Sequence, residues 1–132
     1  SSFVTGVQTC ALRSDVCGAI AAQRHCHRVA VTAAIDEVNF LAPITVGDVV
    51  VLSARVNAAF RTSMEVEVEV KVEDATTGHR RRCVDAFMTF VAVGEDRKPC
   101  AVPPLIAESA DDERRRAEAE TRRAERLAKR RN

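Results

Sequence analysis

Residues 64–73 read Met-Glu-Val-Glu-Val-Glu-Val-Lys-Val-Glu, which is the clearest pattern in the chain. Valine alternates here with glutamate or lysine. Successive side chains of a β-strand point to opposite faces of the sheet, so this period of two predicts one buried valine face and one solvated charged face. The segment therefore predicts a sheet with a core on one side.

Turns and further strands surround this segment. Residues 61–63 (Arg-Thr-Ser) form a polar turn before it, and residues 75–78 (Ala-Thr-Thr-Gly) close a hairpin after it. The chain then returns as a strand over residues 82–93. Residues 29–40 and 49–56 are also predicted strands, because they are rich in β-branched side chains. The second of these is a near-continuous apolar run, typical of a strand that is covered on both faces.

Helices are predicted at both ends of the chain. Residues 16–27 are rich in alanine, and Ser14 and Asp15 stand where N-cap residues belong. Residues 108–132 have high helix propensity and a charge order that suits the helix dipole, but no apolar stripe. We therefore expect a solvated tail after an α+β body, in which one helix precedes a run of antiparallel strands.

Composition narrows the classes of protein further. The chain has 132 residues, 46% of them hydrophobic, and a formal net charge of +1, which argues against a nucleic-acid binder. The tail holds nine basic and seven acidic residues and no aromatic side chain, so it lacks the marks of an RNA- or membrane-binding element. The five cysteines have no framework spacing and are expected to be free thiols in a reducing cytoplasm.

The first fourteen residues look foreign to the rest. Residues 4–14 read V-T-G-V-Q-T-C-A-L-R-S, which resembles the translation of a common sequencing adapter. We expect a non-native segment over 1–14, the α+β domain over 15–106 and a charged helical or disordered tail over 107–132. An ordinary divergent N-terminus is the alternative, and the nucleotide sequence decides between the two.

Several segments in order carry a family resemblance. They are D-x-x-x-A-I-A-A-x-R-H from Asp15, V-T-A-A-I-D-E-V-N-F, P-I-T-V-G-D-V-V, T-S-M-E-V-E-V-E-V, and F-M-T-F-V-A-V-G-E-D with the closing V-P-P-L. Together they resemble the cytosolic acyl-CoA hydrolases and their bacterial broad-range relatives.

The resemblance implies a hotdog fold, in which a curved antiparallel sheet wraps around one central helix. The family's first strand would be missing here. The resemblance also implies an acyl-CoA substrate, no cofactor or metal, and sites at the interface of a homodimer that assembles into a trimer of dimers. A cytoplasmic location is expected, with neither nucleic acid nor membrane as a partner.

Asp15 matches the family's catalytic aspartate. The resemblance implies that it is a general base, or a nucleophile that acts through a mixed anhydride. From the residues alone, an N-cap carboxylate is the alternative. The family has His-Gly-Asn and Gly-Gly before this aspartate, and residues 7–14 differ from both. That departure predicts weaker oxyanion stabilisation and an impaired chain.

Five residues are implied to bind substrate. Arg61, Thr62 and Ser63 match a turn near the CoA moiety, with a plain hairpin turn as the alternative. Asn39 and Phe40 match a segment near the acyl or pantetheine channel, with a core position for Phe40 as the alternative.

Two further clusters invite a functional interpretation. His25, Cys26 and His27 match no zinc spacing and point in different directions on a helix, so a structural role is favoured. The run of three arginines at residues 80–82 could attract the CoA 3′-phosphate, but a solvated charge run is favoured. A second function remains open, a hotdog protein that binds acyl-CoA without hydrolysing it. No histidine-bearing pattern of a hotdog dehydratase is found.

Overall fold

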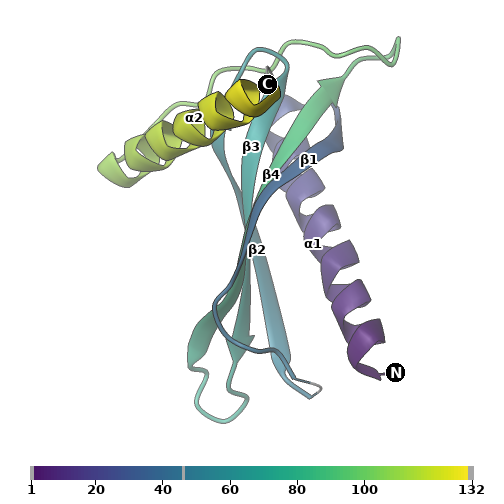
Figure 1. Cartoon of the computed structure of the whole chain (residues 1–132), viewed down its shortest axis with the longest axis vertical. Coiled ribbons are helices and arrows are strands. Elements are labelled where there is room, and N and C mark those ends of the chain that lie inside the picture. The colour runs from purple at the N-terminus through teal and green to yellow at the C-terminus, as the bar shows by residue number, and fades with distance from the viewer. Residues whose placement is uncertain (1, 46, 131–132) are drawn as a thin grey trace.

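A computed structural model of the chain has a twisted four-stranded antiparallel sheet with one helix on each of its faces (Figure 1). It describes residues 2–45 and 47–130, and the side chains of 13–45 and 47–130. The elements in chain order are α1 (Ser2–Cys26), β1 (Val29–Phe40), β2 (Val49–Ala59), β3 (Ser63–Glu73), β4 (Arg80–Val93) and α2 (Ala110–Arg130). Neither described helix combines the length and the hydropathy that a membrane crossing would require.

The strand order is β1-β4-β3-β2, so β1 and β2 are the edges and β3 lies inside. The predicted turns join these strands: β2 and β3 meet at residues 61–63, and β3 and β4 form the hairpin closed by residues 75–78. The prediction that residues 49–56 are covered on both faces is wrong. As an edge strand, β2 leaves Ser53 and Arg55 exposed on one face.

The core lies between α1 and the valine face of the sheet. Val66 and Val68 of β3 are fully buried, as predicted, and pack with Phe90 of β4. On the helix, Ala22 and Cys26 are buried one turn apart. Small side chains at this spacing let α1 lie close against all four strands. The expected arrangement of an antiparallel sheet against one helix is therefore confirmed.

The other face of β3 is not solvated, contrary to the prediction. Glu65 and Glu67 are only 2% and 5% exposed, because α2 covers them. Arg122 donates two hydrogen bonds to Glu65 at 2.7 and 2.9 Å, and Arg115 lies 2.7 Å from Glu67. A charged face of the sheet is thus buried against a charged helix, and each of the two buried carboxylates forms an ion pair with an arginine of α2.

The tail is therefore a docked helix as well as a charged one. Arg115, Arg122 and Arg126 share one face of α2, and Arg126 reaches Asp36 of β1 at 2.9 Å. Ala119 is the one buried residue of Ala110–Arg130. The absence of an apolar stripe in the sequence predicts a solvated helix. In the structure α2 needs no such stripe, because ion pairs make its contact with the sheet.

Candidate active site

Asp15 of α1 and Thr32 of β1 are joined by a short hydrogen bond. The Thr32 hydroxyl donates to Asp15 Oδ1 over 2.6 Å, and both side chains are exposed. A donor on one carboxylate oxygen orients the group and leaves the second oxygen able to accept a proton from water. The pair therefore has the chemistry of an oriented general base beside an edge strand.

The N-cap alternative for Asp15 is wrong. The helix begins at Ser2, so Asp15 lies in its interior rather than at its first turn. Residues 2–14 contain no proline, and nothing in them forces the helix to stop. The carboxylate instead reaches across to Thr32 of β1.

Gly18 brings the helix close to the sheet one turn after Asp15. A Cβ at this position would lie 3.1 Å from the Phe90 ring and 3.3 Å from Val68, which is tighter than ordinary packing. Phe90 is the partner of Thr32 in the register of β1 with β4. The glycine thus permits the close approach that puts the Asp15 carboxylate within reach of the Thr32 hydroxyl.

One chain places the five predicted binding residues in two groups. In the register of the sheet, Val91 of β4 pairs with Ser63 on one side and with Val31 on the other. Because Val31 is next to Thr32, the turn over residues 61–63 lies at the same end of the sheet as the Asp15–Thr32 pair. Asn39 and Phe40 lie seven and eight residues after Thr32 along β1, roughly 23–26 Å away at the rise of an extended strand.

The solvent exposure of the five predicted binding residues decides whether Phe40 is a core residue. Phe40 is 82% exposed, so the alternative that it belongs to the core of this chain is wrong. Asn39 is half-buried beside it. In the turn, Arg61 is exposed while Thr62 and Ser63 are half-buried. The Arg61 and Thr62 carbonyls accept hydrogen bonds from Val102 and Ala92, so the turn is held firmly by its backbone.

The residues of the two other clusters make contacts within the chain. His25 Nε2 lies 2.8 Å from the carbonyl oxygen of Pro103 and so ties α1 to the segment before α2. Cys26 is buried and His27 ends the helix with a φ of 56°. In the hairpin, Arg80 pairs with Glu73 at 2.9 Å and Arg82 with Asp85 at 3.0 Å.

Thr32 is the functional candidate that sequence reasoning missed. A threonine in a predicted strand carries no signal of its own, because the residue type is common there. Its partner Asp15 is 17 residues away and on another element. The sequence could only suggest that the predicted catalytic aspartate contacts the strand that follows it. Which residue of that strand it meets depends on how α1 packs on β1.

Comparison with known proteins shows which family the chain is similar to. Residues 13–79 match the thioesterase superfamily. The chain is 36% identical over 130 residues to the cytosolic acyl coenzyme A thioester hydrolase of Rattus norvegicus, with 97% of the chain and 34% of that protein covered. The chain thus spans about a third of the length of this curated relative.

Solved structures are also similar. An acyl-CoA hydrolase from Staphylococcus aureus, in complex with butyryl coenzyme A, coenzyme A and coenzyme A disulfide, superposes with a TM-score of 0.86 at 32% identity, over 93% of this chain and 75% of that one. A hexameric acyl-CoA thioesterase gives 0.84 at 35% identity, over 94% and 79% of the two chains.

Alanine variants of the Staphylococcus aureus enzyme also have solved structures. Two of them replace an aspartate and a threonine that are 17 residues apart, the same separation as that of Asp15 and Thr32. From the family match and the solved structures together, the chain belongs to the thioesterase superfamily and has its hotdog fold.

Proposed function

We propose that this chain binds acyl-CoA and hydrolyses the thioester to a carboxylic acid and free CoA. The observation that carries the proposal is the 2.6 Å hydrogen bond between Asp15 and Thr32. It supplies an oriented carboxylate in a chain whose relatives are named acyl-CoA hydrolases.

Asp15 activates the attack on the thioester carbonyl. As a general base it takes a proton from water, the hydroxide adds to the carbonyl carbon, and the C–S bond breaks as the CoA thiolate leaves and is protonated. As a nucleophile its carboxylate would add to the thioester carbonyl and displace the CoA thiolate, which gives a mixed anhydride; water then hydrolyses the anhydride to the carboxylic acid and the free Asp15 carboxylate. Thr32 positions the carboxylate in both routes.

Turnover is expected to be slow in this chain. Residues 7–14 lack the glycine pair and the His-Gly-Asn segment of the resembling family, and with them the expected oxyanion donor. Loss of one such donor costs about 100- to 1000-fold in rate. The boundaries at residues 14 and 106 stay predictions, and so does the impairment.

The site is completed by a second copy of the chain. The edge strand β1 carries exposed apolar side chains, including Val31 at 48%, Ile35 at 60% and Phe40 at 82%. Such an exposed apolar edge is a template for pairing. Antiparallel pairing of two β1 strands about an axis near Ile35 brings Asn39 and Phe40 of the second copy beside Thr32.

This arrangement joins the two groups of binding residues that one chain keeps apart. Arg61, Thr62 and Ser63 then meet the CoA moiety near Thr32, while Asn39 and Phe40 of the second copy line the acyl or pantetheine channel. A homodimer, assembled as a trimer of dimers, is the proposed state, and hexameric solved relatives support it.

The cytoplasm is the proposed compartment. The four cysteines within the described side chains are free thiols, as a reducing compartment keeps them. The mammalian relative that matches 97% of the chain is named cytosolic.

Replacing Thr32 tests its positioning role. We expect Thr32→Val to lower kcat for thiol release from acyl-CoA by about 10- to 100-fold, because a hydrogen bond to a charged group is lost. Thr32→Ser keeps the hydroxyl and should retain most of the rate. KM and the melting temperature should change little, since Thr32 is exposed. A valine variant as active as the unmodified chain would remove Thr32 from the mechanism.

A charge on the β1 edge tests the dimer. We expect Ile35→Glu to weaken self-association about 100-fold, because each copy loses an apolar contact at the axis, about 3 kcal/mol in total. Sedimentation should then show the 14.4 kDa monomer, and thiol release should fall with the oligomer. The matched control is Val49→Glu on the β2 edge, where Val49 is 44% exposed. Oligomers that survive Ile35→Glu while Val49→Glu breaks them would place the interface elsewhere.

A further inference from the structure

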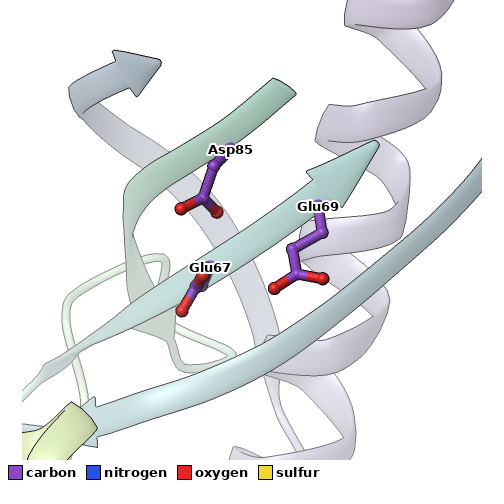
Figure 2. Close-up of side chains that lie close together, drawn as sticks. All are labelled: Glu67, Glu69 and Asp85. Atoms are coloured by element: carbon purple, nitrogen blue, oxygen red, sulfur yellow. The ribbon is translucent and has the colours of Figure 1, made fainter. Parts of the chain in front are cut away.

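Three carboxylates gather on the face of the sheet that is turned away from α1. Glu67 and Glu69 of β3 and Asp85 of β4 each offer an oxygen, and these oxygens lie within 4.8 Å of one another. Figure 2 shows the three side chains on neighbouring strands, with the Asp85 carboxylate directed toward Glu67. Among the residues whose side chains the structure describes, no other such group is found.

Asp85 provides a second and independent observation. The residue is only 7% exposed, and its Oδ1 is buried without a hydrogen-bond partner. Burial, and then the neighbouring Glu67 carboxylate, raise the pKa of Asp85 to about 7.

The cations already present contact the cluster from its rim. Arg82 lies 3.0 Å from Asp85 and 3.6 Å from Glu69, and Lys71 lies 3.4 Å from Glu69. The Arg82 and Lys71 side chains are 48% and 33% exposed, so both can turn toward solvent. Arg115 is engaged with Glu67 at 2.7 Å from the side of α2. None of these contacts reaches Asp85 Oδ1.

The spacing of the oxygens suits a calcium-sized ion. Ca²⁺ binds oxygen at about 2.3–2.6 Å, so oxygens up to roughly 5 Å apart can share one ion. Mg²⁺ binds at about 2.0–2.1 Å and would need a tighter cluster. A cleft of about 310 Å³ adjoins two of the three carboxylates and gives room for water ligands; Glu67 and Glu69 line it together with Arg55 and Arg115.

We propose that Glu67, Glu69 and Asp85 bind one divalent cation of the calcium class on the outer face of the sheet. The ion links β3 to β4, with Arg82 turned outward. It lies on the opposite face of the sheet from Asp15, so its role is to stabilise the fold rather than to act in hydrolysis.

Calorimetric titration of the full chain with CaCl₂ at pH 8 tests the proposal. We expect one equivalent bound, at least tenfold weaker binding in Asp85→Asn and Glu69→Gln, and tighter binding in Arg82→Gln, which removes the competing guanidinium. Glu73→Gln, on the same strand, is the matched control and should bind as the unmodified chain does.

Two results would overturn the proposal: no binding at millimolar calcium, or equal binding in the unmodified chain and in Glu69→Gln. Glu69 is only half-buried, so its variant is expected to fold and keeps the test decisive if Asp85→Asn does not fold. The readout is independent of thioester hydrolysis, and its failure leaves the proposed enzyme untouched.

Discussion

Asp15→Asn is expected to lower kcat for acyl-CoA hydrolysis by about 100- to 10,000-fold, the range that a positioned general acid or base contributes. Asparagine retains an oxygen that can accept the Thr32 hydroxyl, so the geometry at the 2.6 Å contact should persist while the proton acceptor is lost. The measurement is the steady-state rate of thiol release with a chromogenic thiol trap.

The control for Asp15→Asn is Glu95→Gln, which removes an exposed carboxylate from the turn after β4. This variant should keep the full rate. Both variants should melt at the temperature of the unmodified chain, because both carboxylates are exposed. If Asp15→Asn turned over acyl-CoA as fast as Glu95→Gln, the catalytic group would have to be sought elsewhere.

Arg122→Ala should have the largest effect on stability. Glu65 is 2% exposed and receives two hydrogen bonds from Arg122, which also lies 3.8 Å from the centre of the Phe87 ring. Removing one partner of a buried ion pair leaves an uncompensated charge and costs about 3 kcal/mol or more. The free energy of unfolding from urea titrations measures this loss.

Two further variants separate the ion pair from general effects on the helix. Lys129→Ala, near the exposed end of α2, should change the free energy of unfolding by less than about 0.5 kcal/mol. Glu65→Gln combined with Arg122→Ala should recover part of the loss, because no buried charge is then left alone. An Arg122→Ala variant as stable as Lys129→Ala would mean that α2 does not hold the sheet.

The sheet and its main helix could be predicted from sequence because their patterns are local. Alternation in β3 and the turn residues on either side of it define a hairpin arrangement without any knowledge of distant contacts. The edge position of β2 could not be read this way. A run of apolar residues occurs both in central strands and in edge strands with exposed apolar side chains, so the sequence does not distinguish the two positions.

The docking of α2 was missed for a different reason. Its contact with the sheet rests on arginines at residues 115, 122 and 126, which meet carboxylates on two separate strands. An analysis of hydrophobic periodicity does not detect a contact that is made by ion pairs. The seven- and four-residue spacing of the arginines marks one helical face, but only the positions of Glu65 and Glu67 make it an interface.

The site was predictable in part. Asp15 could be found through the family resemblance, whereas Thr32 needed the packing of α1 against β1 to bring the two side chains together. The distance between the turn at residues 61–63 and Phe40 could not be foreseen, since it depends on the register of four strands. That distance is also what makes a second copy of the chain necessary to the proposed site.

The most direct test of the account is multiple-turnover release of CoA from an acyl-CoA ester by the unmodified chain, measured together with equilibrium binding of the same ester. Catalysis by the Asp15–Thr32 pair predicts release that continues well past one equivalent and that is lost in Asp15→Asn while ester binding is kept. Tight binding by the unmodified chain, with CoA released no faster than in buffer, would contradict the account and identify a protein that binds acyl-CoA without hydrolysing it.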